Sequence, residues 1–398
     1  MSTKPKNQRN NSLQLAITSY GLQSVTGNQD FALFGAIATM LNASAEDPLT
    51  EVPSPDGYGS NPAIIAPIQK FEEYNPGDRM IMCLQNAILD AIERLPPVTL
   101  NGVDKKQLFM IITPATVFER SRTINIDSWK EFLKEELDEF SASQVHFINA
   151  DANVTKNLQI ALAAINEGKF DTLIFAGVDS LVNDITCNEL VTQNKLCSNT
   201  ISDGVIPGEA AACVVIEKID AKKTNALAII KNLAFAEEPN SGKPHLKQLS
   251  GLSQAIQSVT QQAGQLPDDI DCIIRNSTTE QHFELEWYQT TQRIWSNKLS
   301  EKDRVAYQLG ELDEPPKLKS RKLPEELKTS YTLGEIGAAS IPLNLVLAGA
   351  RFDFNYPVVK NCLICEANEF LFRGAILLQN PRITSQADLD KRPDSSIR

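Results

Sequence analysis

Two segments of the chain are apolar on nearly every side of a helix, and the rest of the pattern repeats around them. The first runs from Leu158 to Ile165 and is closed by Gly168, and the second runs from Ala338 to Ala350. A helix without a polar face belongs inside a protein rather than on its surface. Because each segment is followed by two apolar, β-branched runs, the sequence predicts two buried helices that each precede a pair of strands.

The remaining alternation of apolar and polar positions predicts an α/β protein, in which strands covered on both faces are continuous apolar runs. We expect strands at 13–18, 107–113, 145–150, 171–182, 210–219, 225–236, 270–276, 358–366 and 370–378. We expect helices at 31–41, from 78 to the residue before Pro96, and at 129–140, 158–165, 188–193, 250–264, 281–295 and 338–350. The Pro/Ser/Asp/Gly-rich stretch 44–67 is predicted to be a loop with little structure of its own, and 296–329 a charged insertion.

The order of these elements occurs twice along the chain. We predict an N-terminal half at 13–220 and a C-terminal half at 221–380, with a disordered tail at 1–12 and a flexible tail at 381–398. Two similar α/β halves, each with a buried central helix, predict a five-layer α-β-α-β-α sandwich of two pseudo-repeated halves.

Composition and charge argue against several classes of protein. The 398 residues carry a formal net charge of −12, whereas binding to nucleic acid or an anionic membrane needs clustered Lys and Arg. No apolar run reaches about 18 residues, the length that a membrane span requires. The polar N-terminus MSTKPKNQRNNS lacks the apolar core of a signal peptide, so we expect a cytoplasmic protein whose seven cysteines are reduced.

The sequence predicts neither a metal site nor a bound cofactor. Three scattered histidines show no metal-ligand spacing, and neither GxGxxG nor a Walker sequence occurs. Cys362 and Cys365 form a CxxC within a predicted strand, where residues three apart point to opposite faces, so we interpret them as core thiols.

Three segments resemble the ketosynthase branch of the thiolase superfamily, which includes the beta-ketoacyl-ACP synthases. They are FAGVDSLV at 175–182, GVIPGEAAACVVIEKI at 204–219 and YTLGEIGAASIPLNLVLAGA at 331–350. The resemblance spans roughly 13–380 and implies the thiolase-like sandwich fold. It also implies acyltransferase chemistry on substrates carried by the phosphopantetheine of acyl carrier protein (ACP) or by coenzyme A.

The chain departs from this family at the three positions that the resemblance marks as catalytic. The family uses a cysteine at the tip of the first buried helix, activated by the helix N-terminus, and two further residues, His/His or His/Asn. Those positions fall on Asp151, Asn276 and Glu335. The glycine-rich turn expected before the last strand is also missing, and CLICEANE stands at 362–369 instead.

Each of these residues has a structural interpretation beside the catalytic one. Asp151 suits an N-cap that accepts from the N–H of Asn153 or Val154, which contributes about 1 kcal/mol, or it acts as a base if desolvation raises its pKa. Glu335, at the start of the second buried helix, has the same two interpretations. His282 is a secondary candidate that we interpret first as half of an i, i+4 surface pair with Glu286.

Two hypotheses of function follow from the resemblance and its departures. The first is a ketosynthase-like protein without Cys-dependent condensation that binds acyl groups, acyl-CoA or ACP. It would act as a homodimer, or as the chain-length-factor-like partner of an active ketosynthase in fatty acid or polyketide-type biosynthesis. The alternative is a Cys-independent decarboxylase, hydrolase or acyltransferase that uses Asp151 and Glu335. A misplaced register is disfavoured, because no cysteine lies between 84 and 186.

Overall fold

The computed structural model describes most of the chain. The described residues are 13–71, 74–95, 106–136, 144–220, 226–241, 243, 248–276, 280–295, 301–312, 323–354 and 356–383. The tail predicted at 1–12, most of the tail predicted at 381–398, and the end of the helix predicted at 129–140 lie outside them.

The predicted strands are all present, and three further strands occur. The strands are β1 (Gln14–Ser24), β2 (Ala45–Pro53), β3 (Ser60–Ile65), β4 (Gln107–Thr113), β5 (Gln144–Asn149), β6 (Thr172–Ser180), β7 (Glu209–Ile219), β8 (Ala228–Glu237), β9 (Cys272–Asn276), β10 (Glu325–Lys328), β11 (Asn361–Glu366) and β12 (Phe372–Gln379).

The predicted helices are also present, with shifted ends. The α-helices are α1 (Asp30–Ala38), α2 (Pro76–Glu93), α4 (Ile126–Glu136), α5 (Val154–Asn166), α6 (Asp184–Thr192), α7 (Gly251–Gln262), α8 (Gln281–Ile294), α9 (Glu301–Gln308), α10 (Ser330–Leu333) and α11 (Ser340–Phe354). Short 3-10 turns are η1 (Gln69–Phe71), η2 (Glu119–Thr123), η3 (Pro267–Asp269) and η4 (Gly337–Ala339).

The main sheet has ten strands in the order β10-β9-β11-β12-β8-β1-β7-β6-β4-β5, and this order is the same five-strand arrangement twice. In each arrangement two of the four strand pairings are parallel and two are antiparallel, so four strands run in one direction and one, β7 or β12, runs against them. The set β5, β4, β6, β7, β1 therefore corresponds one to one with the set β10, β9, β11, β12, β8. The sets meet where β1 pairs with β8 over only two residue pairs, whereas β1 pairs with β7 along its full length, from Gln14↔Ile219 to Ser24↔Ala210.

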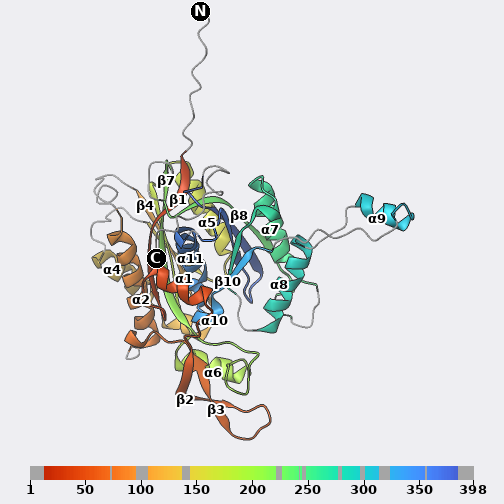
Figure 1. Ribbon diagram of the computed structural model, residues 1–398. Helices are drawn as coiled ribbons and strands as arrows, with labels where there is room; N and C mark the ends of the chain where they lie inside the picture. The colour runs from red at the N-terminus through yellow and green to blue at the C-terminus, as the bar shows by residue number, and fades with distance from the viewer. Residues whose placement is uncertain are drawn as a thin grey trace, which may run out of the picture.

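The helices form three layers around these two half-sheets (Figure 1). Helices α5 and α11 lie in the middle and contact strands of both sets, α2 covers β1, β7 and β6 from outside, and α7 covers β8 and β12. The α-β-α-β-α sandwich predicted from the two apolar helices is therefore confirmed. In α11 the predicted absence of a polar face is also confirmed, because every residue from Ser340 to Phe352 is buried.

Separate apolar clusters fill the spaces between layers. The cluster between the half-sheets includes Leu158, Phe175 and Leu347, and the clusters under the outer helices are centred on α2 and on α7. Cys362 lies in the middle cluster and Cys365 in the cluster under α7, so the two thiols point to opposite faces of β11 as predicted.

Two stretches expected to be irregular contain strands. The predicted loop 44–67 forms the hairpin β2–β3, whose inner side packs Val52 and Ala63 against Cys187 of α6 and Leu196. The predicted insertion 296–329 contains α9 and also β10, which completes the second five-strand set. The apolar signal of β10 is weak, because its four residues are EELK and Leu327 is the only buried one.

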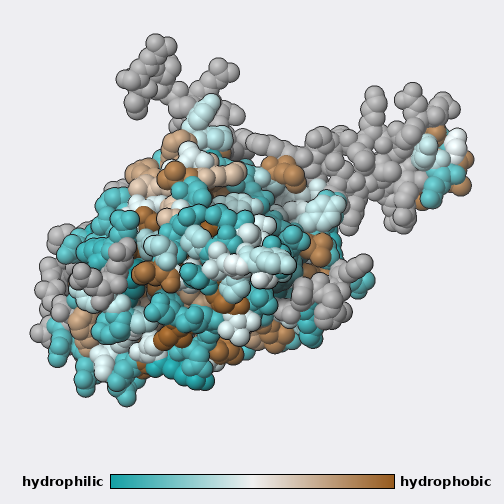
Figure 2. Space-filling model, turned by 90° about the horizontal axis from the view of Figure 1, so that it is seen from below, coloured by the Kyte–Doolittle hydropathy of each residue, from teal (hydrophilic) through white to brown (hydrophobic). Residues whose placement is uncertain are grey.

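The outside of the molecule gives no sign of one continuous apolar face in the view from below. There, hydrophobic and hydrophilic residues are interspersed, and α9 lies apart from the main body in this view as in the first (Figure 2). Within the described residues, no helix is both long enough and apolar enough to span a membrane.

Candidate functional site

The carboxyl ends of the parallel strands in both half-sheets converge on one cavity. Parallel strands end at the same edge of a sheet, which is where open α/β folds bind their ligands. Ile112 of β4 and Asp179 of β6 line the cavity from the N-terminal set, and Asn276 of β9 and Glu366 of β11 line it from the other. Its internal volume is about 100 Å³. The topology therefore places the site between the two halves.

The two central helices also begin at this cavity. Val154 opens α5 and lines the cavity, and Ser340 does the same for α11. The predicted cap of α5 is wrong by two residues. The side chain of Asn153, rather than that of Asp151, accepts a hydrogen bond from Lys156 N at 2.9 Å. The helix begins at Val154, so residue 151 belongs to the preceding turn.

Glu335 is fixed through its backbone by the PGE turn that precedes β7. Glu335 N donates to Ile206 O at 2.7 Å, and Gly208 N donates to Glu335 O at 3.0 Å. Any side chain at Gly208 would be excluded, because its Cβ would lie 2.0 Å from Leu333 O. Two sequence motifs about 130 residues apart are thereby joined, and their contact holds Glu335 at the cavity wall.

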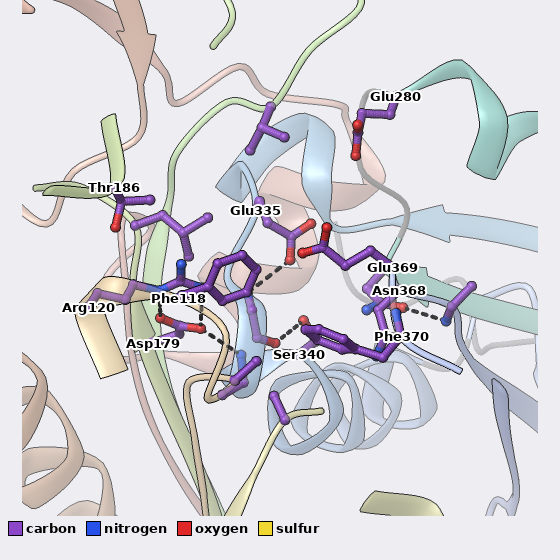
Figure 3. Close-up of a pocket in the computed structure, with 18 of the residues that line it drawn as sticks. Phe118, Arg120, Asp179, Thr186, Glu280, Glu335, Ser340, Asn368, Glu369 and Phe370 are labelled. Atoms are coloured by element: carbon purple, nitrogen blue, oxygen red, sulfur yellow. Dashed lines mark hydrogen bonds and ion pairs between the residues drawn. The ribbon is translucent and has the colours of Figure 1, made fainter. Parts of the chain in front are cut away.

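A buried ion pair forms the opposite wall (Figure 3). Arg120 Nε donates to Asp179 Oδ1 at 2.8 Å and Arg120 Nη2 to Asp179 Oδ2 at 3.1 Å, and both residues are buried. Asp179 Oδ2 also accepts from Ala338 N at 3.1 Å. The guanidinium lies 4.2 Å from the ring centroid of Phe118. This bidentate geometry neutralises both charges, since a buried ion pair is tolerated only when its hydrogen bonds are satisfied.

Carboxyl groups dominate the wall that the C-terminal set provides. Removal from water raises the pKa of Glu335 to about 7; the hydrogen bond from Gly337 N opposes this, and the charges of Asp179 and Glu369 add to it. Burial likewise raises the pKa of Glu366 to about 7, against a hydrogen bond from Thr155 Oγ1 at 3.0 Å. Two carboxyl groups in this wall therefore exchange protons near neutral pH.

The mouth of the cavity carries an ion pair and a further carboxyl group. Lys195 Nζ lies 2.9 Å from Glu280 Oε1. Burial raises the pKa of Glu369, the Lys195 charge lowers it, and the Glu280 charge raises it again. Figure 3 shows Glu335 and Glu369 on the same side of the cavity, facing the Arg120–Asp179 pair.

Apolar side chains fill the rest of the lining. Phe118 and Phe370 meet edge to face with ring centroids 6.1 Å apart, so one aromatic ring comes from each half of the chain. The other large apolar lining residues are Ile112, Val154, Leu181, Leu190, Val205, Phe283 and Ile341. An apolar cavity with a few convergent polar groups is the usual form of a small-molecule site.

Of the site residues predicted from sequence, Asn276 and Glu335 line this cavity and Asp151 and His282 do not. The carboxylate of Asp151 accepts from Thr116, both from its hydroxyl and from its N–H at 3.3 Å. Asn276 Oδ1 accepts from Ala367 N at 3.4 Å. The structure thus brings together two of the three positions that the resemblance marks, and turns the third toward the loop after β4.

The predicted surface pair of His282 and Glu286 is wrong. Glu286 is buried and pairs instead with the buried Arg373, whose Nε donates to Glu286 Oε1 at 2.8 Å. Burial lowers the pKa of His282, with opposing contributions from the charges of Glu280 and Lys195. His282 and Glu286 do lie on one face of α8, as their i, i+4 spacing predicts, but that face is turned toward the protein interior.

The sequence analysis missed Arg120, Asp179, Glu366 and Glu369 as site residues. A signal for two of them was present in CLICEANE, where carboxylates stand in place of the glycine-rich turn. Asp179 is the second-last residue of β6, so its place near the carboxyl end of a predicted strand was also a signal. Arg120 had none, because the turn η2 that carries it has no periodic pattern.

None of the residues that line the cavity in the described part of the chain is a cysteine or a histidine. All seven cysteines are free and buried elsewhere. Burial raises the pKa of Cys187 to about 11 and raises the pKa values of Cys83, Cys213 and Cys365 further. Such thiols stay protonated and are poor nucleophiles. No group of three or more His, Cys, Asp or Glu side chains among the described residues is arranged to hold a metal ion.

Comparison of the structure with solved proteins identifies its fold as that of the thiolase-like ketosynthases. A chain of the AntDE:AntF structure, a type II PKS acyl-carrier protein in complex with its ketosynthase, matches with a TM-score of 0.67 and 12% identity over 92% of this chain and 99% of that chain. The ishigamide ketosynthase/chain length factor matches with a TM-score of 0.67 and 12% identity, over 93% of this chain and 99% of that chain. The ketosynthase from module 6 of the Bacillus subtilis 168 bacillaene synthase matches with a TM-score of 0.69 and 11% identity, over 92% of this chain and 72% of that chain. No family model and no curated protein sequence matches the chain.

Proposed function

We propose that this chain is a ketosynthase-fold protein that does not perform Cys-dependent condensation. In this role it binds an acyl group or ACP and pairs with an active ketosynthase, as a chain-length-factor-like subunit. The observation that carries the proposal is the lining of the cavity between the halves, which offers carboxyl groups where the condensing chemistry needs a thiolate and hydrogen-bond donors.

The charge of the cavity supports this role. Decarboxylative condensation requires a malonyl carboxylate to enter and a developing oxyanion to be stabilised. The carboxyl groups of Glu335, Glu366 and Glu369 repel both, and the guanidinium of Arg120 is already neutralised by Asp179. An unreactive cavity of this kind suits a subunit that recognises an acyl chain or its carrier without elongating it.

The free edge of β5 supports a dimeric role. Among the described residues β5 pairs only with β4, so its other edge is open to a second chain. A second cavity, of about 550 Å³, runs along that edge and is lined by Arg122, Lys130 and His146 among others. Open edge strands are the usual templates for pairing between chains. One of the similar structures is itself named a ketosynthase/chain length factor.

Co-expression with a Cys-containing ketosynthase encoded nearby tests the partner role directly. We expect a 1:1 complex by size-exclusion chromatography with light scattering, and loss of that complex in His146→Lys, which adds charge to the exposed edge. Gln257→Lys, on the exposed side of α7, is the matched control. Neither complex nor homodimer in solution, with wild-type folding intact, would contradict this role.

Intact-mass analysis after incubation with acyl-ACP or acyl-CoA tests the chemistry. We expect no covalent adduct on the protein and no condensation product from malonyl-ACP. A thioester adduct on any cysteine would overturn the proposal.

A Cys-independent acyl-group enzyme is the second candidate, and the pKa values of Glu335 and Glu366 favour it. Groups that titrate near pH 7 are suited to general acid–base catalysis at neutral pH. Glu335 with Asn276 would then act on the substrate, and the predicted role of Asp151 would be indirect, through Thr116. Hydrolysis of acyl-CoA or acyl-ACP that is flat between pH 5 and 8, or unchanged in Glu335→Gln, would exclude this candidate.

A further inference from the structure

Helix α1 is apolar on its outward face as well as on the face that packs inward. Its buried face lies against α11 and α10 (Figure 1). The residues on the opposite, exposed face are Phe31, Ala32, Gly35, Ala38 and Thr39. No charged side chain occurs between Asp30 and Glu46. A helix without a polar face belongs inside a protein, so the outward face of α1 lacks a partner within the described part of the chain.

Large apolar side chains extend this face beyond the helix. Phe31, Met40, Leu41 and Phe354 are each more than half exposed. Phe354 adjoins α1, because its ring centroid lies 5.0 Å from that of Phe34. At roughly 100 Å² each, the four exposed side chains present on the order of 400 Å² of apolar surface. That is about half of the roughly 800 Å² that each partner buries in a standard interface, where a polar rim supplies the rest.

The backbone at Met40 gives an independent sign that this face is covered. Leu41 N donates to Ala36 O at 2.8 Å and Met40 N donates to Ile37 O at 3.1 Å, the two bonds of a Schellman motif. Residue 40 therefore has a φ of 51°, a conformation that suits glycine. The chain instead places there a methionine that is 72% exposed. A strained, water-exposed apolar residue gains nothing in the isolated chain, so we infer that its contacts lie in a partner.

Charge distinguishes between the kinds of partner. A helix that docks on an anionic membrane carries Lys and Arg beside its apolar face, whereas this segment has neither and the chain has a net charge of −12. Two copies of so acidic a chain repel each other wherever charged surfaces meet. The outward face of α1 with Met40, Leu41 and Phe354, here called the α1 face, is uncharged and avoids this repulsion.

The side chains along the α1 face are arranged so that the face is complementary to itself. Phe31 lies at one end, Met40 and Leu41 lie at the other, and Gly35 is near the middle. A Cβ at Gly35 would meet no atom within 4 Å, so a second backbone has room to approach there. When two such helices cross antiparallel, Phe31 of each copy meets Met40 and Leu41 of the other, as a two-fold interface requires. Antiparallel helix dipoles also favour this arrangement.

We propose that the α1 face binds the α1 face of a second copy of this chain, antiparallel and around a two-fold axis near Gly35. Strand β1, which leads into α1, is separated from β5 by β7, β6 and β4 in the sheet. The contact therefore leaves the β5 edge free. Two complexes of this chain with a ketosynthase would join through α1, and the contact forms whether or not that ketosynthase is present.

Sedimentation velocity of the full chain tests this contact. We expect a reversible dimer with a dissociation constant in the micromolar range, because the area is small for a stable interface. Gly35→Glu brings two carboxylates together at the axis and should weaken the dimer at least tenfold. Its thermal midpoint should match the wild type, because the new Cβ meets no atom. Leu266→Glu, at an apolar residue that is 67% exposed, is the matched control and should leave the dimer unchanged.

Disulfide trapping tests the antiparallel geometry. All seven native cysteines are buried, so a cysteine introduced on the surface is the accessible thiol. Diamide, which oxidises two thiols to one disulfide, should link Gly35→Cys to itself. In a mixture it should link Phe31→Cys to Leu41→Cys, and Leu266→Cys should remain unlinked. A link of Phe31→Cys to itself, without the mixed product, would overturn the antiparallel arrangement.

A chain that is monomeric at about 100 µM would overturn the inference, as would a dimer that Gly35→Glu leaves intact. Flotation with phosphatidylcholine vesicles that Gly35→Glu abolishes would assign the face to a bilayer instead. Loss of the ketosynthase complex in Gly35→Glu would assign it to that partner. His146→Lys, at the β5 edge, should leave self-association unchanged. Failure of this inference and failure of the proposed partner role are therefore distinguishable.

Discussion

The two walls of the cavity contain similar groups in opposite electrostatic states. The wall from the N-terminal set holds Asp179, whose charge is neutralised by Arg120 in a bidentate pair. The wall from the C-terminal set holds Glu335 and Glu366, whose pKa values burial raises instead. A buried carboxylate needs either a cation or a proton. The first state stabilises a fold, and the second leaves a group free to respond to a ligand.

The same contrast occurs away from the cavity. Arg79 pairs with Glu209, and Arg373 with Glu286, and all four side chains are buried. This chain therefore supplies arginines to buried carboxylates elsewhere in the core but not to Glu335 or Glu366. The difference argues that the unpaired carboxyl groups are there for binding rather than as unavoidable features of packing.

Among the variants proposed, one that removes Asp179 should have the largest effect on the free energy of unfolding. Asp179→Ala leaves Arg120 as an uncompensated buried charge and removes the acceptor of Ala338 N. We expect a loss of roughly 3–5 kcal/mol in the free energy of unfolding, measured by urea denaturation. Arg122→Ala, which breaks the exposed pair with Glu119, should cost less than about 0.5 kcal/mol. A loss below about 1 kcal/mol for Asp179→Ala would mean that the pair is not structural.

Gly337, where the two walls touch, should give the next largest effect. A Cβ at this position would lie 2.0 Å from Asp179 Oδ2, and its φ of +47° is unfavourable for other residues. We expect Gly337→Ala to cost about 3 kcal/mol in thermal or chemical unfolding. Gly57 has a φ of +78°, and a Cβ built there would meet no atom within 4 Å. Gly57→Ala therefore isolates the backbone cost of about 1 kcal/mol. Equal losses in the two variants would show that Gly337 has no steric role.

The acidic wall should appear in the pH dependence of stability. The pKa of Glu335 is higher in the folded protein, about 7, than the ordinary value of 4.5. The unfolded chain therefore ionises first, and stability falls as pH rises from about 4.5 to 7. In Glu335→Gln the side chain stays neutral at every pH, so up to roughly 2 kcal/mol of this loss of stability should be absent from the variant. We would measure unfolding free energies at pH 4.5 and 8; identical pH profiles for the wild type and the variant would contradict the raised pKa.

The start of α5 should show the smallest effect. Asn153→Ala removes the N-cap and should cost about 1 kcal/mol. Asp151→Ala should cost less, because its carboxylate is half-exposed and does not cap the helix. Comparing the losses in unfolding free energy of the two variants by urea denaturation tests which residue caps the helix. A larger loss for Asp151→Ala than for Asn153→Ala would identify residue 151 as the cap.

The layers of the fold could be predicted because their signal is local. The apolar runs of α11, and of the strands after both central helices, indicate burial within a dozen residues. For α5 the predicted burial on nearly every side is wrong, because Gln159, Ile160 and Ala163 are exposed. Strand β10 could not be found in this way, because EELK has one buried side chain and owes its position to pairing with β9.

The cavity was harder to predict because its residues come from strand ends far apart in the chain. The resemblance located Asn276, at the end of β9, and Glu335, just before η4 and α11, because each position adjoins an apolar element. It also assigned the helix mouth to Asp151, because it counted back along α5 and could not show which way the side chain turns. Glu366 lies closer to the start of α5 than the resemblance suggested for any carboxylate of the C-terminal set, because Thr155 in the first turn of α5 donates a hydrogen bond to it.

Pairing of β1 with β7 has a consequence for synthesis on the ribosome. Gln14 pairs with Ile219, and the other side of β1 is met only by β8, at Ile229 and Ala228. At translation rates of roughly 5–20 residues per second, the first strand emerges roughly 10 to 40 seconds before its partner has been made. During that interval the hydrogen-bonding groups of β1 have no partner strand, so its edges stay open until β7 has been made.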